Sequence, residues 1–171
     1  MNYPIPTHLK SIFRVNERDT DSSNLSGSIV CDCGCVFFSI LHNENRQYND
    51  KLIYSEQDGL KVVAICNNCH KKHLLFDEAT QGYNGLVCGD FKTAPDDSLT
   101  DLICHKCGST VFSITMDIEI EDKEQFIEEC VNEYPDRFSP DDYISSFDWI
   151  TINVCCQKCS KRIEWISLEL S

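Results

Sequence analysis

Short cysteine-rich stretches recur along this chain of 171 residues, and they limit what it can fold into. In the first half the cysteines are Cys31, Cys33 and Cys35, followed by Cys66 and Cys69. In the second half they are Cys104 and Cys107, followed by Cys156 and Cys159. Two close pairs of thiolates suit a tetrahedral zinc ion, because each pair occupies one edge of the tetrahedron. The sequence therefore predicts two metal sites, each holding a structural Zn²⁺.

The two halves are similar to each other in sequence. Residues 33–40 align without gaps over residues 107–114, and the shared residues are a Cys, a Gly and a Phe-Ser-Ile run. Further along, Cys66 and Cys69 align over Cys156 and Cys159. Similarity that keeps its order along the chain indicates duplication of one unit.

The alignment bears on which cysteines bind metal in the first unit. It places Cys33 over Cys107 and Cys35 over Ser109, so a deletion of one residue makes Cys31 the partner of Cys33. Cys33 with Cys35 is the alternative pair. The predicted ligands are Cys31, Cys33, Cys66 and Cys69 for one ion, and Cys104, Cys107, Cys156 and Cys159 for the other. The remaining cysteines, Cys35, Cys88, Cys130 and Cys155, are predicted not to bind metal.

Apolar runs rich in Val, Ile, Phe and Trp surround each cysteine pair, as strands prefer. The predicted strands are 36–41, 60–65 and 73–76 in the first unit, and 111–118, 149–155 and 163–170 in the second. A further strand is expected within residues 83–89, after a glycine-rich reversal.

This arrangement resembles the zinc-ribbon fold group, in which two cysteine knuckles at the ends of β-hairpins hold one zinc. The resemblance covers residues 29–88 and 102–171, and it implies a fold rather than an activity. Both units depart from the group because their cysteine pairs are separated by more than the usual stretch of about 15–20 residues. Insertions are therefore expected in both units.

The predicted fold class is a small, β-rich α+β protein with two tandem, duplicated zinc-ribbon-like units. Residues 1–28 are expected to form an N-terminal segment and linker, with a short helix after Thr7. The first unit spans 29–92, a linker spans 93–101, and the second unit spans 102–171. Small units of this size bury little apolar surface, and bound metal compensates for that.

The second unit carries an acidic insertion over residues 117–148, which contains twelve Asp and Glu residues and two basic ones. Phe126, Ile127, Cys130 and Val131 recur at helical spacing, which predicts a helix with one apolar face. Ser139 before a proline predicts the start of a second short helix. The acids are either a solvated face or a docking surface for a basic partner.

Composition narrows the function classes. The formal net charge is −13, and two zinc ions in four-thiolate sites would bring it to about −17. Broad nucleic-acid binding is disfavoured, because it requires a basic surface. The predicted function is non-catalytic binding of another macromolecule, with a protein favoured as the partner. An acidic inhibitor or immunity-type protein that covers a basic effector is one example.

The alternative function is a nucleic-acid-associated zinc ribbon of the transcription or RNA machinery. It is favoured locally by two basic clusters just after the second knuckles, at residues 70–73 and 158–162. A reducing cytoplasm is the expected location, since no signal peptide or membrane-spanning run is visible, and there Cys-x-x-Cys indicates metal or redox chemistry before disulfides.

Other uses of the cysteines are weaker hypotheses. Iron can occupy the same four thiolates, and zinc is preferred on frequency alone. Cys66 to His70 matches a c-type haem attachment motif, but attachment normally requires export. Dithiol redox chemistry favours a pair at a helix start, whereas these pairs lie between strands. His70 or His73 could replace a missing cysteine ligand. No catalytic motif is apparent, so an enzyme is not expected.

Overall fold

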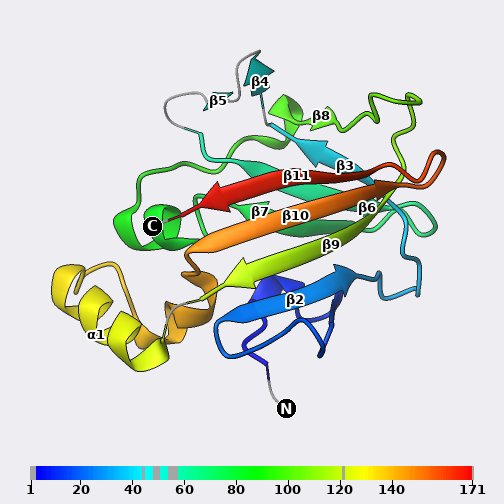
Figure 1. Ribbon diagram of the computed structural model, residues 1–171. Helices are drawn as coiled ribbons and strands as arrows, with labels where there is room; N and C mark the ends of the chain where they lie inside the picture. Colours follow the sequence, from blue (N-terminus) through cyan, green and yellow to red (C-terminus); the bar gives the residue numbers. More distant parts are fainter. Residues whose placement is uncertain (1–2, 44, 48–50, 54–57, 121, 171) are drawn as a thin grey trace.

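The computed structural model describes residues 3–43, 45–47, 51–53, 58–120 and 122–170. Its main feature is an antiparallel sheet of nine strands, which is curled like half of a barrel (Figure 1). A separate hairpin is formed by β4 (Asn45–Gln47) and β5 (Lys51–Ile53). The prediction of a β-rich fold is confirmed.

Two antiparallel sets of three strands make up most of the sheet. The first set is β3 (Phe38–His42), β6 (Lys61–Cys66) and β7 (Lys72–Asp77). The second set is β9 (Phe112–Glu119), β10 (Trp149–Cys156) and β11 (Arg162–Glu169). All six strands predicted around the cysteine pairs are confirmed, with ends that differ by no more than two residues.

The two sets pair in the same register. Phe38 lies opposite Cys66 in the first set, and Phe112 lies opposite Cys156 in the second. Both hairpins also contain a β-bulge at the matching place, between Val62 and Val63 in β6 and between Ile152 and Asn153 in β10. The sequence alignment between the two halves therefore corresponds to the same strand pairing in space.

The two sets meet at the first residues of β3 and β9, where Phe38 pairs with Phe112. From there the sheet curls, so that strands that are not neighbours in it face each other. The rings of His42 in β3 and Trp165 in β11 lie edge to face, with centroids 5.0 Å apart. Phe38 and Phe112 are almost fully buried in the core that the curled sheet encloses.

The N-terminal segment contributes to this sheet. A 3-10 helix (Thr7–Leu9) is followed by β1 (Phe13–Val15) and β2 (Asn24–Ile29), and β2 pairs with β9. Residues 24–28 are thus part of a strand rather than of a linker. Similarly, the predicted linker 93–101 contains a 3-10 helix (Asp96–Ser98) and β8 (Thr100–Asp101), which pairs with β3. The division into two domains at these boundaries stays a prediction.

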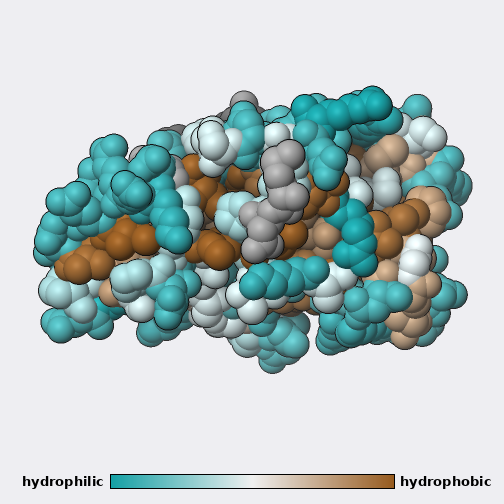
Figure 2. Space-filling view, turned by 90° about the horizontal axis from the view of Figure 1, so that it is seen from below, coloured by the Kyte–Doolittle hydropathy of each residue, from teal (hydrophilic) through white to brown (hydrophobic). Residues whose placement is uncertain are grey.

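The acidic insertion forms the expected helix. α1 (Lys123–Glu133) begins after Asp122, whose carboxylate accepts hydrogen bonds from the backbone N–H groups of Glu124 and Gln125. Phe126 and Cys130 are buried, and the acidic side chains face outward. A 3-10 helix (Pro140–Ser145) follows at the predicted capping site. Hydrophobic side chains also reach the surface at the α1 end of the molecule (Figure 2), where Val131 is 39% exposed.

The prediction of a strand within residues 83–89 is wrong. Residues Tyr83–Cys88 form a π-helical turn, because the backbone N–H groups of Gly82, Tyr83 and Asn84 donate to carbonyl oxygens from distant segments. Among the described residues, the helices are too short and too polar to cross a membrane.

Candidate metal centres

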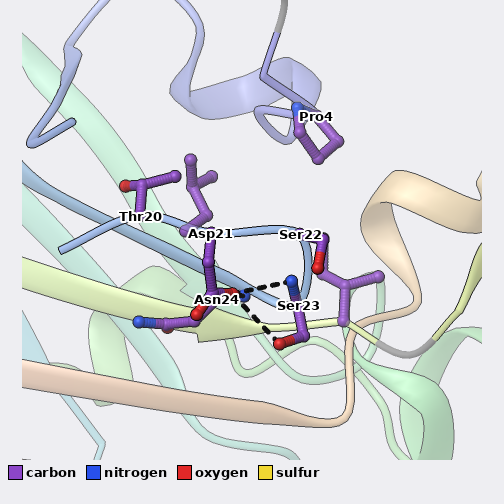
Figure 3. A pocket seen from close by; sticks show the side chains of 8 residues that line it. Pro4, Thr20, Asp21, Ser22, Ser23 and Asn24 are labelled. Carbon is purple, nitrogen blue, oxygen red and sulfur yellow. Dashed lines mark hydrogen bonds between the residues drawn. The ribbon is translucent and has the colours of Figure 1, made fainter. Parts of the chain in front are cut away.

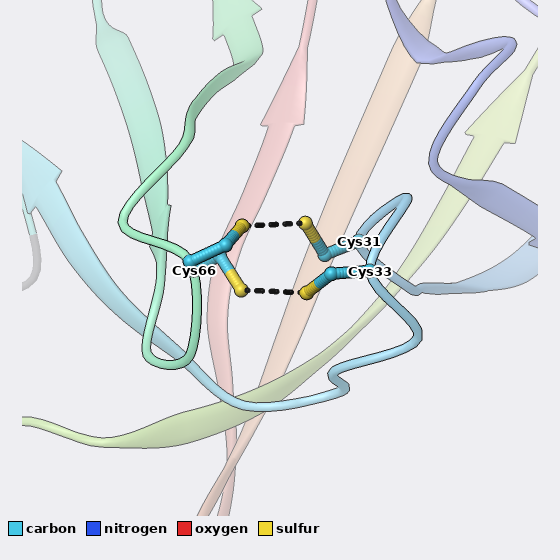
Figure 4. Close-up of side chains that lie close together, drawn as sticks. Cys31, Cys33 and Cys66 are labelled. Atoms are coloured by element: carbon cyan, nitrogen blue, oxygen red, sulfur yellow. Dashed lines mark hydrogen bonds between the residues drawn. The ribbon is translucent and has the colours of Figure 1, made fainter.

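The first cysteine cluster joins the β2–β3 loop to the β6–β7 hairpin. Cys31 and Cys33 lie in the loop, Cys66 ends β6, and Cys69 lies in the following turn. Figure 4 shows the loop cysteines facing the hairpin, with their sulfur atoms directed at one another. The Sγ of Cys31 is 3.6 Å from that of Cys69, and the Sγ of Cys33 is 3.5 Å from that of Cys66.

The second cluster has the same construction. Cys104 and Cys107 lie in the loop between β8 and β9, Cys156 ends β10, and Cys159 lies in the β10–β11 turn. The Sγ atoms of Cys104 and Cys159 are 3.7 Å apart, and those of Cys107 and Cys156 are 3.5 Å apart. Within each cluster all four sulfur atoms lie within 4.8 Å of one another.

These distances fit a metal better than a disulfide. A tetrahedral zinc with Zn–S bonds of about 2.3 Å has S···S edges of about 3.8 Å. A disulfide requires sulfur atoms about 2.05 Å apart. The measured separations of 3.5–3.7 Å are close to the edges of a zinc tetrahedron. Each cluster can therefore hold one metal ion with four protein ligands.

Backbone hydrogen bonds fix the loop cysteines in the same way in both clusters. The Gly34 N–H donates to the Cys31 carbonyl, and the Gly108 N–H donates to the Cys104 carbonyl, each over 2.8 Å. Both glycines have positive φ angles, +83° and +71°, which side chains rarely adopt. The N–H groups that follow the two glycines, those of Cys35 and Ser109, donate to the sulfur atoms of Cys33 and Cys107.

The hairpin knuckles also match. The N–H of His70 donates to the Cys66 carbonyl and that of Ser160 to the Cys156 carbonyl, each over 2.9 Å. His70 and Ser160 both have positive φ angles, 60° and 54°. Non-glycine residues in this region are uncommon, so their occurrence at matching positions shows how tightly each turn is constrained.

The local environment lowers the pKa of two thiols in each cluster, Cys33 and Cys66 in the first and Cys104 and Cys156 in the second. At Cys66, burial raises the thiol pKa, but the backbone N–H groups of Cys69 and Asn68 together with the neighbouring sulfur atoms outweigh it, and the pKa falls to about 6. At Cys156 burial is outweighed in the same manner by the Cys159 N–H and by neighbouring sulfur, and the pKa again falls to about 6. A cation arriving at neutral pH therefore meets an ionised sulfur in both clusters.

The two clusters differ in their surroundings. In the first, His73 is buried and its Nε2 lies 3.3 Å from the Sγ of Cys31. The corresponding residue of β11 is Ile163, which has no donor. Asp32 and Lys71 form an ion pair beside the first cluster, and the Asn68 amide lies 3.7 Å from the Sγ of Cys33.

Among the residues weighed as ligands, Cys35 is outside the first cluster. Its backbone carbonyl accepts from the Cys31 N–H, just as the Ser109 carbonyl accepts from the Cys104 N–H. The structure thus places Cys35 where the alignment placed it, over Ser109. Of the other remaining cysteines, Cys130 is buried in the core, whereas Cys88 and Cys155 are partly exposed.

The sequence did not assign His73 to a particular contact. Alternation along β7 was the available signal, since His73 shares a face with the buried Leu75. Nor did it identify the outer face of β9, β10 and β11 as a surface of interest. Along β9 the residues between the buried ones, Ser113, Thr115, Asp117 and Glu119, are all polar, as strands with one solvated face require.

Pockets for a small ligand are limited in the described part of the chain. The cavity beside the β1–β2 turn, where the Asp21 carboxylate accepts from Ser23, measures about 10 Å³ (Figure 3). That volume accommodates about one water molecule. Two larger hollows, of about 460 and 340 Å³, lie open on the second three-stranded set.

No protein-family model, curated protein or solved structure matches this chain. The eight clustered sulfur atoms are therefore the strongest indication of what it does.

Proposed function

We propose that the protein holds two structural zinc ions and acts as a non-catalytic binding module for another protein. The observation that carries the proposal is the pair of four-sulfur clusters with edges of 3.5–3.7 Å. Four protein ligands leave no coordination position for water or substrate, so such a site stabilises a fold and does not hydrolyse bonds. Zinc is favoured over iron because all-thiolate structural sites most often contain it.

Native mass spectrometry of protein purified without added metal tests the metal content. We expect two zinc ions per chain. Cys33→Ser should leave one zinc, whereas Cys35→Ser, a matched change two residues away, should leave two. A metal-free folded protein, or loss of a zinc in the Cys35 variant alone, would contradict the proposed ligands.

We also propose that the two cysteine-bearing units are copies of one zinc-ribbon-like unit. Three features support this: the common strand register, the β-bulges at matching positions in β6 and β10, and the equivalent turns at both knuckles. Unrelated hairpins have no reason to share all three. The fold thus consists of two ribbon-like units whose strands continue into one sheet.

For the partner, we favour a basic protein. With two zinc ions bound the net charge would be about −17, which repels nucleic acid and attracts cationic surfaces. An inhibitor or immunity-type protein that covers a basic effector would have this charge and size. The exposed acids of the outer face of β9, β10 and β11 would supply the complementary surface.

The nucleic-acid function is less well supported than protein binding, because some of the basic residues after the knuckles already have partners. In the cluster after the first knuckle, Lys71 is engaged by Asp32, and His73 is buried against Cys31. Lys72 after the first knuckle, and Lys158, Lys161 and Arg162 after the second, are exposed. Four exposed cations divided between two knuckles of a strongly acidic chain are a weak basis for phosphate binding.

Calorimetric titrations with a hexa-arginine peptide and with a short single-stranded DNA separate the two functions. We expect the peptide to bind one to one, with an affinity that falls as salt rises, and the DNA not to bind even at low salt. Binding of the DNA, or no binding of the peptide, would overturn the choice of a basic protein partner.

A further inference from the structure

The outer face of β9, β10 and β11 is a bare sheet surface. In the described part of the chain no helix packs over it (Figure 1). Alternate residues of β9 and β10 are buried beneath it, so the residues between them point outward. Arg162, at the knuckle end, is the sole basic residue in these three strands, whereas the outward-facing residues include several acids. The face is therefore negatively charged toward its other end.

One cross-strand row at that end combines an aromatic ring with two carboxylates. Trp149 in β10 pairs with Glu119 in β9 on one side and with Glu169 in β11 on the other. Directly opposed residues in a sheet have Cβ atoms about 4.5–5.5 Å apart, so both glutamate side chains leave the sheet next to that of Trp149. The indole Nε1 donates to the Ser167 hydroxyl over 3.1 Å, which holds the ring along the sheet surface.

The carboxylates of this row have no cationic partner among the described residues. Neither Glu119 nor Glu169 lies within 4.0 Å of a basic side chain there. Both are exposed, whereas Trp149 is partly buried. By contrast, Asp117 on the same face accepts a hydrogen bond from Asn153. The charge of the Glu119 and Glu169 carboxylates is thus available to an incoming cation.

The row also borders a hollow. A groove of about 340 Å³ is lined by Glu119, Trp149, Glu169 and Asp148, together with the turn that precedes β2. Its volume lies at the lower end of the range for ligand sites, which suits a single side chain rather than a large molecule.

We propose that this groove, defined by Glu119, Trp149 and Glu169, binds an arginine side chain of the basic protein partner. A guanidinium is planar and can stack on the indole while its N–H groups pair with the flanking carboxylates. Lysine presents a compact, strongly hydrated charge and matches a flat ring between two acids less well. The proposal rests on the proposed function and specifies where the partner docks.

The test follows the Trp149 indole N–H by NMR while hexa-arginine is added to the zinc-loaded protein. We expect the Trp149 signal to shift and saturate, and the signal of the buried Trp165 to stay in place. The double variant Glu119→Gln, Glu169→Gln should bind at least about tenfold more weakly. The control Glu124→Gln, Glu128→Gln makes the same charge change on α1 and should weaken binding less than about twofold.

The possible outcomes separate the groove from the wider function. Equal weakening in both double variants would show that net charge alone attracts the peptide. That result would refute binding in the groove but would leave the proposal of a basic protein partner intact. An unmoved Trp149 signal during saturable binding would lead to the same conclusion. Equal affinity for hexa-lysine would overturn the preference for arginine. No binding at all would overturn the proposed partner class. Thermal melts and zinc content of each variant confirm that the fold is retained.

Discussion

The contact between Phe38 and Phe112 provides a test of whether the two halves of the chain form one cooperative unit. These residues begin β3 and β9 and pair with each other across the sheet. Their side chains are 0% and 1% exposed, so replacement by alanine removes a fully buried ring. Such a change costs about 3–5 kcal/mol, which is a large part of a typical total stability of about 5–15 kcal/mol.

The positions of the tryptophans make the test direct. Both lie in the second set of strands, Trp149 in β10 and Trp165 in β11. In urea, Trp fluorescence reports unfolding of the second set, and circular dichroism reports the whole sheet. With a slope of about 2 kcal/mol per M, Phe38→Ala should lower the fluorescence midpoint by about 2 M although Phe38 belongs to the first set.

A double-mutant cycle completes the argument. Because Phe38 and Phe112 are cross-strand partners, their alanine variants should show a coupling energy of at least about 0.5 kcal/mol. Val131→Ala, at an exposed position of α1, serves as a control with little effect. If Phe38→Ala leaves the fluorescence midpoint unchanged while circular dichroism shows an earlier transition, the halves unfold independently, and the two-domain division predicted from sequence is correct.

Three further predictions concern single side chains. His73→Ile introduces the residue found at the equivalent position beside the second cluster and removes the donor beside Cys31. Zinc at the first cluster should then be lost to a competing chelator about ten times more readily, as measured by metal release. Glu78→Gln keeps an acceptor for the Leu60 N–H but removes a buried carboxylate whose pKa is raised by burial. Because that folded pKa exceeds the unfolded value, the variant should be more stable at neutral pH in urea titrations, and the gain should disappear as the pH falls toward about 4.3. Asp122→Ala removes the N-cap of α1 and should cost about 0.5–2 kcal/mol, seen as a lower Tm, whereas Asp122→Asn should cost less.

The cysteine clusters and the strands beside them could be predicted because their signals are local. Alternation of apolar residues marks β9 and β10, and the spacing of Cys104 and Cys107 marks a knuckle. The alignment of Cys35 over Ser109 correctly placed Cys35 outside the first cluster. Which cysteines the structure groups together was thus predictable, since both signals extend over only a few residues.

The segments that were missed depend on distant contacts. β2 consists mainly of small and polar residues, and its strand conformation depends on pairing with β9. At Gly27, a Cβ atom would lie 2.4 Å from the ring of Phe13, so the glycine is required by a neighbouring strand. The π-helical turn at Tyr83–Cys88 is likewise held by carbonyl oxygens of Ser145, Phe147 and Leu170. No local pattern contains that information.

The positions of the clusters also explain how two small metal sites can stabilise one large sheet. Four residues on adjacent strands form a row across the sheet: Cys66, Phe38, Phe112 and Cys156. With strands about 4.8 Å apart, the two cysteines are separated by roughly 14 Å along the sheet. Each metal would tie the loop that leads into β3 or β9 to a neighbouring hairpin, and so fix the strand ends that meet at Phe38 and Phe112. Ions bound in the two clusters would therefore act on a single junction, and loss of either should loosen the contact on which the other half of the sheet depends.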